Sequence, residues 1–144
     1  MKQLPPPQAA FPHQLASRLR YGDTDRQGHI NNAVYASLLE EGRAHMLYNA
    51  RTGVLEGGTS FVVADLQIGF RHELLWPDEI TICTAVEKIG TSSVVMAHAI
   101  YRDGTCCATG RTIMVQVSDE TRRPEPISGA IRAQLEALAL RTPA

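Results

Sequence analysis

Residues 20–35 read Arg20-Tyr21-Gly22-Asp23-Thr24-Asp25-Arg26-Gln27-Gly28-His29-Ile30-Asn31-Asn32-Ala33-Val34-Tyr35. Two carboxylates, a histidine, a glycine and two asparagines lie within ten of these residues, from Asp23 to Asn32, at the entry to a periodic segment. Within that segment apolar residues or glycine recur every fourth residue, at Val34, Leu38, Gly42 and Met46. This spacing predicts an α-helix from Asn32 to about Asn49. The polar stretch thus ends at a helix N-terminus, whose free amides and partial positive charge suit a developing oxyanion.

The polar stretch has two interpretations. A carboxylate upstream of the helix can act as a base or a nucleophile, and Gly28 lets the backbone approach a ligand closely. Alternatively, Asp23 and Asp25 can end a strand through Asx turns, and Asn31 or Asn32 can simply cap the helix. The residues alone therefore indicate a candidate site and leave its reaction open.

After the helix the apolar period changes from four to two. Four runs alternate in this way: Leu66, Ile68 and Phe70; Ile80, Ile82 and Val86; Val94, Met96 and Ile100; and Ile113, Val115 and Val117. Turn signals separate the runs, and Asp103-Gly104 is typical of a two-residue hairpin. The order predicts an α+β fold with four consecutive antiparallel strands. Gly42 in mid-helix predicts a close approach of another element to that face.

Proline content and a helix-capping residue predict the organisation of the two ends of the chain. We expect a flexible, proline-containing arm over residues 1–16 and a single domain over 17–144, with a short strand at 17–21. Ser128 is typical of the N-cap of a tail helix that carries Ile131, Leu135 and Leu138 on one side. Several strands are also apolar on their second face, which therefore needs a cover; a second subunit is one candidate.

Composition excludes several classes of protein. The 144 residues allow one domain, and 14 Lys and Arg against 15 Asp and Glu give a formal charge of −1, which argues against a basic nucleic-acid binder. No apolar run approaches the roughly 20 residues that span a bilayer. Three prolines interrupt the start where a secretory signal needs an apolar run, so we expect a cytoplasmic protein. The odd set of three cysteines is interpreted as reduced packing residues with no metal site.

Common catalytic signatures are missing from the sequence. It lacks a Gly-x-Ser-x-Gly elbow, a phosphate-binding Gly-Lys-Ser/Thr loop, a paired-histidine zinc helix and a dinucleotide-binding glycine motif. Four histidines stand apart from other ligand-type residues and are interpreted as surface or satisfied side chains: His13, His45, His72 and His98.

A family resemblance adds what spacing cannot supply. The run from Tyr21 to Tyr35, followed by Glu41 and Arg43, closely resembles the signature of hotdog-fold acyl-CoA thioesterases, nearest to the 4-hydroxybenzoyl-CoA thioesterase-like group. The resemblance extends from Leu19 to Ile127. It implies a curved antiparallel sheet wrapped around one long helix. It also implies a homodimer or a dimer of dimers joined edge to edge, with active sites at the dimer interface.

The same resemblance suggests roles for individual residues. Asp25 matches the catalytic carboxylate, and the backbone N–H of Asn32, helped by Gly28, matches the donor that polarises the thioester oxygen. The positions implied for substrate binding are His29, Asn31, Tyr35 and Phe61, together with Arg71, Thr91 and Ser92 as candidates for coenzyme A. Tyr35 is expected to wall the acyl pocket, and His29 either lines that pocket or orients the loop. The turn that holds Thr91 and Ser92 is equally well read as a plain hairpin turn. No metal or cofactor is implied, because coenzyme A is part of the substrate.

The implied activity is hydrolysis of a fatty or aromatic acyl-CoA to the free acid and coenzyme A. One alternative is an acyl-thioester hydratase or dehydratase on the same fold. In that group an Asp and a His usually lie five residues apart, whereas Asp25 and His29 are separated by four. A second alternative is a non-catalytic acyl-CoA-binding protein, against which the intact Asp25 argues.

Overall fold

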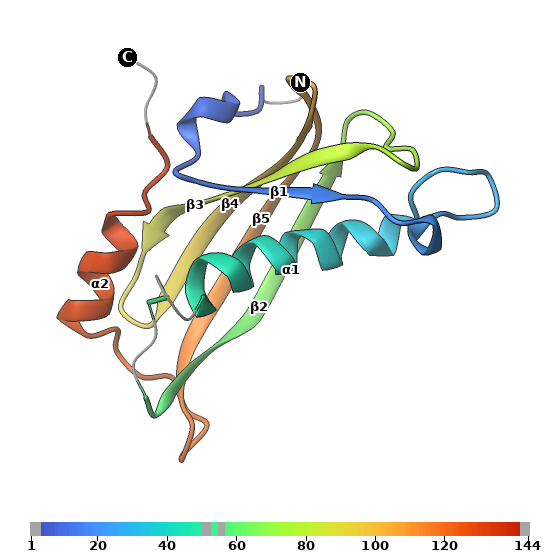
Figure 1. Cartoon of the computed structure of the whole chain (residues 1–144). Coiled ribbons are helices and arrows are strands. Elements are labelled where there is room, and N and C mark those ends of the chain that lie inside the picture. The colour runs from blue at the N-terminus through green and yellow to red at the C-terminus, as the bar shows by residue number, and fades with distance from the viewer. Residues whose placement is uncertain (1–3, 50–52, 55–56, 142–144) are drawn as a thin grey trace.

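One long helix lies across a five-stranded antiparallel sheet that curves around it (Figure 1). The computed structural model describes residues 4–49, 53–54 and 57–141. The main elements are β1 (His13–Arg18), α1 (Asn32–Tyr48), β2 (Thr59–Phe70), β3 (Glu79–Ile89), β4 (Ser93–Arg102), β5 (Thr105–Ser118) and α2 (Gly129–Glu136). The strand order is β1-β3-β4-β5-β2, which leaves β1 and β2 as the two edges. The predicted α+β order of one long helix followed by four consecutive antiparallel strands is confirmed.

Local signals placed several elements correctly. The predicted helix agrees with α1 to within one residue. Asp103 and Gly104 connect β4 to β5 with φ values of 48° and 78°, the left-handed geometry that two-residue hairpins require. Ser128 caps α2 by accepting a hydrogen bond from the N–H of Ile131 at 3.2 Å.

The expected strand at residues 17–21 is wrong in its bounds. The strand β1 spans His13–Arg18, and Tyr21 begins a short 3₁₀ turn that ends at Asp23. Pairing with β3 sets these limits, because His13 lies opposite Thr84 at one end and Arg18 opposite Glu79 at the other. The expected division between residues 16 and 17 thus falls inside β1.

The helix α1 packs over two apolar clusters. Leu39 and Ile82 belong to the cluster under its first half, and Met46 and Met96 to the cluster under its second half. Gly42 lies over β3, where an added Cβ would come within 2.7 Å of Ile82 Cγ2 and of Thr84 Oγ1. The predicted close approach at Gly42 is therefore confirmed.

The opposite face of the sheet is partly covered by the chain itself. Phe11 is buried in a third cluster with Cys83, Ala99 and Tyr101. The Tyr101 hydroxyl donates a hydrogen bond to the carbonyl of Pro6. The segment ahead of β1 thus supplies part of the cover that this face was expected to need.

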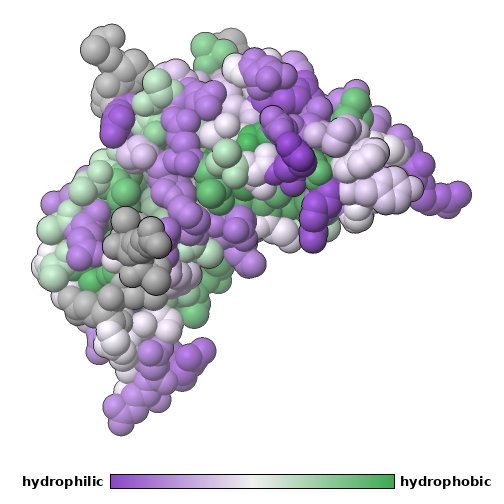
Figure 2. All heavy atoms as spheres, in the orientation of Figure 1, coloured by the Kyte–Doolittle hydropathy of each residue, from purple (hydrophilic) through white to green (hydrophobic). Residues whose placement is uncertain are grey.

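The edge strand β2 has little cover from the helix. Its residues Val63, Leu66 and Phe70 pair with Met114, Thr112 and Ala108 of β5, and so share the sheet face on which α1 lies. All three β2 side chains are nevertheless exposed. In the space-filling view apolar residues reach the surface along the margin where β2 runs, whereas the tip after β5 is polar (Figure 2). Within the described ranges, no helix combines the length and the apolar character needed to cross a bilayer.

Candidate active site

The loop between β1 and α1 is folded back on itself by its own polar groups. The buried Asp23 side chain accepts a hydrogen bond from the backbone N–H of Arg20 at 2.8 Å, and its backbone carbonyl accepts one from Asn31 at 2.9 Å. Thr24 and Ile30 form an isolated antiparallel bridge. Asp23 therefore stabilises the conformation of the loop.

Asp25 lies at the centre of this loop. Its Oδ1 accepts hydrogen bonds from the backbone N–H groups of Gln27 at 2.9 Å and His29 at 3.1 Å. Gly28, at φ +82°, donates its N–H to the Asp25 carbonyl at 3.2 Å and turns the chain in a way that favours glycine. Among the described residues no donor is bonded to Asp25 Oδ2, so one carboxylate oxygen is held and the other is available.

The two asparagines at the helix entry differ in their roles. Asn31 is the N-cap, because its side-chain oxygen accepts a hydrogen bond from the N–H of Ala33 at 3.0 Å. Asn32 is the first helical residue, so its own N–H belongs to the turn that has no intrahelical acceptor. A helix amide is thereby presented beside Asp25.

An open pocket of about 340 Å³ is lined by five of the predicted site residues: Asp25, His29, Asn32, Tyr35 and Arg71. One wall is aromatic, with the rings of Tyr35 and Phe70 packed edge to face at a centroid distance of 4.9 Å. Burial raises the pKa of the Tyr35 hydroxyl, so this wall stays uncharged at neutral pH. The pocket thus combines an apolar wall with a free carboxylate oxygen and a helix N-terminus.

Three other predicted residues lie elsewhere in the chain. Phe61 is buried in the core cluster beneath the second half of α1. Thr91 and Ser92 form the turn at the far end of β3, roughly 30 Å from the pocket by strand length. Their carbonyls accept hydrogen bonds from the N–H groups of Ile127 and Gln116. Within one chain these three residues do not join Asp25.

A larger open hollow of about 770 Å³ lies on another part of the surface. It is formed by β1, β3 and the β4–β5 turn, and it contains the exposed ion pair of Arg18 and Glu79. None of the predicted site residues lines it. Its walls offer no carboxylate beside a helix N-terminus, so the smaller pocket is the better candidate.

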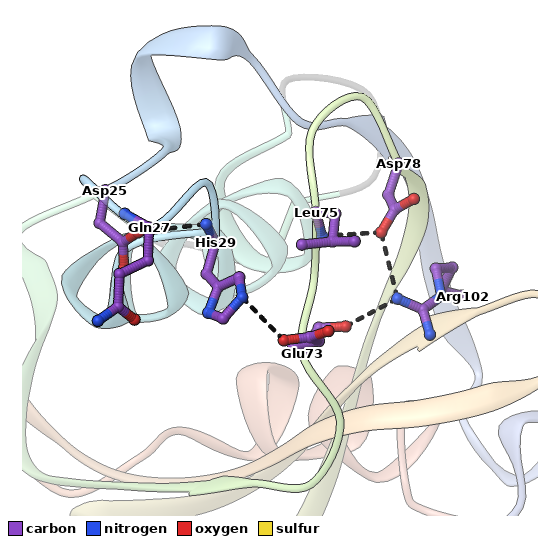
Figure 3. A network of polar contacts seen from close by, with 7 residues as sticks. All are labelled: Asp25, Gln27, His29, Glu73, Leu75, Asp78 and Arg102. Atoms are coloured by element: carbon purple, nitrogen blue, oxygen red, sulfur yellow. Dashed lines mark hydrogen bonds and ion pairs between the residues drawn. The ribbon is translucent and has the colours of Figure 1, made fainter.

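A polar network connects the Asp25 loop to the loop between β2 and β3 (Figure 3). The His29 Nε2 atom lies 3.0 Å from Glu73 Oε2. Arg102 holds the second loop by donating to the Glu73 carbonyl at 2.7 Å and by pairing with Asp78 at 3.2 Å. Glu73 and Arg102 were not predicted from the sequence, because neither has a spacing that relates it to residues 20–35. Among the described residues, no three His, Cys, Asp or Glu side chains come together as a metal site.

Residues 19–135 match the family described as the thioesterase-like superfamily. The chain belongs to this superfamily. The long-chain acyl-CoA thioesterase FadM of Escherichia coli is 25% identical over 127 residues, which cover 85% of this chain and 96% of FadM. A thioesterase of Thermus thermophilus, solved with coenzyme A and zinc, is 31% identical with a TM-score of 0.78 over 92% of this chain and 98% of that one. The PA5185 protein of Pseudomonas aeruginosa is 25% identical with a TM-score of 0.81, covering 94% and 96% of the two chains.

These comparisons agree with the resemblance drawn from residues 19–127. The sheet wrapped around α1 is the hotdog arrangement of thioesterases, and the predicted fold is confirmed. For this member of the thioesterase-like superfamily, the comparisons support hydrolysis of a thioester as the class of chemistry. The acyl group and the roles of individual residues have to be inferred from the lining of the pocket.

Proposed function

We propose that this chain is an acyl-CoA thioesterase that hydrolyses a fatty or aromatic acyl-CoA to the free acid and coenzyme A. One observation carries the proposal: Asp25 keeps one carboxylate oxygen free in a pocket that Asn32, at the N-terminus of α1, also lines. FadM and the coenzyme A complex from Thermus thermophilus support the substrate class.

The proposed reaction follows from the two polar groups of the pocket. The backbone N–H of Asn32 and the positive end of α1 polarise the thioester oxygen and stabilise the oxyanion that forms on it. Asp25 Oδ2 then either attacks the carbonyl carbon or takes a proton from the water that attacks it. Because two backbone N–H groups fix Oδ1, Oδ2 is presented with little freedom to move.

The lining of the pocket suggests how the substrate lies. The acyl group is placed against the aromatic wall of Tyr35 and Phe70. Coenzyme A carries phosphates, and Arg71 is the arginine among the residues that line the pocket. Thr91 and Ser92 can contribute only from a second subunit, whereas Phe61 is buried in the core of its own chain. The proposal therefore includes a homodimer or a dimer of dimers.

Release of free thiol tests the activity directly. A panel of acyl-CoAs is incubated with the protein and a thiol reagent, and the wild type is expected to liberate coenzyme A from at least one chain length. Asp25→Asn is expected to lower kcat by about 10²–10⁴-fold while the protein still folds, because the base or nucleophile is gone. The matched control is Asp103→Asn, the same substitution in the exposed β4–β5 turn, where Asn accepts the left-handed geometry.

The alternatives give different readings in the same assay. A hydratase changes the absorbance of an enoyl-CoA without freeing thiol, and a binding protein retains acyl-CoA without turning it over. If the wild type releases no coenzyme A from any member of the panel, the thioesterase proposal fails. If Asp25→Asn keeps the full rate, the role given to Asp25 is wrong.

A further inference from the structure

An imidazole and a carboxylate face the same pocket as Asp25. His29 Nε2 and Glu73 Oε2 are 3.0 Å apart, and both residues line the pocket. Figure 3 shows the His29 ring between Asp25 on one side and Glu73 on the other. The site therefore contains a second group able to move a proton.

This ion pair is not needed to hold the two loops together. His29 and Leu75 form a backbone bridge, and the Ile30 N–H donates to the Leu74 carbonyl at 3.0 Å. Arg102 fixes the Glu73 backbone from the other side. The side chains of His29 and Glu73 are 44% and 60% exposed, and pairs as open as this contribute little to folding.

Thioester hydrolysis has a need that Asp25 does not meet. When the C–S bond breaks, its electron pair leaves with sulfur, and the alkyl thiolate of coenzyme A must gain a proton. Asp25 has either taken a proton from water or become acylated at that stage. Imidazolium carries a proton on both ring nitrogens, so one can be held while the other is given away.

We infer that His29, positioned by Glu73, protonates the departing thiolate of coenzyme A; this inference rests on the proposed function. The Nε2–H stays bonded to Glu73, and Nδ1, to which no described residue is bonded, gives its proton to sulfur. Water then restores that proton from Asp25, or supplies it when the acylated Asp25 is hydrolysed. The net reaction consumes one water and yields the acid and the thiol. Glu73 is a positioning residue, since it fixes the ring and its tautomer without touching the substrate.

Two esters of the same acyl group separate this role from a structural one. One is the acyl-CoA, and the other is the thioester of 4-nitrothiophenol, whose thiolate is weakly basic and leaves without a proton. His29→Asn is expected to lower kcat for the acyl-CoA by about 10²-fold and to leave the aryl ester within about threefold of wild type. Glu73→Gln is expected to show the same selectivity at about tenfold, and Glu73→Asp to recover most of the loss.

Two controls accompany these variants. Glu79→Gln removes a more exposed ion pair outside the pocket and is expected to leave both rates unchanged. Asp25→Asn is expected to lose activity toward both esters, because hydrolysis of either ester requires attack on its carbonyl carbon. Circular dichroism and thermal unfolding establish that each variant is folded.

The outcomes distinguish the inference from the proposed function. If His29→Asn lowers kcat equally for the two esters, or for neither, the leaving-group role of His29 is overturned. Hydrolysis of acyl-CoA by the wild type would still support the proposed thioesterase function. If Glu73→Asp is no better than Glu73→Gln on the acyl-CoA, the positioning role of Glu73 is wrong. If the wild type cleaves neither ester and releases no coenzyme A from the acyl panel, the proposed function itself fails and the inference falls with it.

Discussion

At the scale of single residues, His98 is the histidine whose surroundings differ most from water. It lies on β4 under α1 and is only 1% exposed. Its Nε2 is hydrogen-bonded to Thr112 Oγ1 at 2.7 Å, whereas its buried Nδ1 has no partner among the described residues. Its sequence-based interpretation as a satisfied histidine is thus right for one ring nitrogen. Burial, with a smaller effect of the nearby Arg43, lowers the pKa of His98 to about 3.

The lowered pKa of His98 predicts a loss of stability in mild acid. Between about pH 6.5 and pH 3 the unfolded chain binds a proton that folded His98 does not, so the free energy of unfolding falls as the pH falls. From pH 7 to pH 5 this one group is expected to cost about 2 kcal/mol. Urea unfolding at the two pH values measures the change.

A variant isolates the contribution of His98. His98→Gln keeps a polar group near Thr112 and cannot titrate, so its loss between pH 7 and pH 5 is expected to be smaller by about 2 kcal/mol. The pKa of His13 is also lowered, by burial and by His45, but His13 is present in both proteins and its effect cancels. Equal pH dependence in the two proteins would contradict the assignment to His98.

Residues of the site could be predicted where they are close in sequence. Asp25 and His29 belong to one loop and Asn32 begins the helix directly after it, so one local motif predicted all three. Glu73 reaches the pocket from the loop between β2 and β3. Nothing in a one-dimensional spacing relates it to His29, because the contact depends on how the sheet brings the two loops together.

At the scale of elements, Gly42 fixes how closely α1 approaches β3. A Cβ at this position would lie 2.7 Å from both Ile82 Cγ2 and Thr84 Oγ1, atoms of buried, β-branched side chains with little freedom to move. Glycine costs a helix about 1 kcal/mol against alanine, yet overpacking a core costs about 1–3 kcal/mol. We expect Gly42→Ala to lower the free energy of unfolding by up to about 2 kcal/mol, measured by denaturant unfolding.

A substitution on the exposed face of the same helix provides the comparison. Ser37→Ala improves helix propensity without meeting the sheet, so it is expected to be neutral or slightly stabilising. If Gly42→Ala stabilised the protein as much as Ser37→Ala does, the close approach of α1 to β3 would make no difference to the free energy of unfolding.

Elements defined by a local period were predicted well, and those defined by pairing were not. The helix and the Asp103-Gly104 hairpin follow from neighbours in sequence. The limits of β1 follow from its register against β3. In β5 the residues that face α1 include Met114 and Thr112, whereas the apolar alternation of the sequence runs through Ile113 and Val115 on the other face. Which face of a two-sided strand is covered by the helix is a tertiary fact that the alternation does not contain.

At the scale of the whole molecule, β2 is an edge strand of the sheet that exposes apolar side chains. Val63, Leu66 and Phe70 are 47%, 37% and 45% exposed, at the margin of the sheet face on which α1 lies but beyond the part that α1 covers. An open edge that carries apolar side chains and unpaired backbone groups is prone to pair with another strand. Pairing of β2 with β2 of a second copy would extend the sheet and cover the stripe, and the Phe70 ring places that stripe beside the pocket wall.

This arrangement predicts that assembly and activity are lost together. Leu66→Arg places a charge in the middle of the proposed paired edge. An uncompensated buried charge there costs about 3–5 kcal/mol, which weakens the dimer by about 10²–10⁴-fold. Sedimentation velocity is expected to give a dimer or a dimer of dimers for wild type and a folded monomer for Leu66→Arg, with thioesterase activity reduced to the same extent as the dimer. The exposed Leu4, which lies off this edge, supplies the control Leu4→Arg, for which mass and rate are expected to be unchanged. A wild-type monomer with full activity, or a Leu66→Arg monomer that keeps it, would show that one chain completes its own site and that the exposed stripe of β2 serves another purpose.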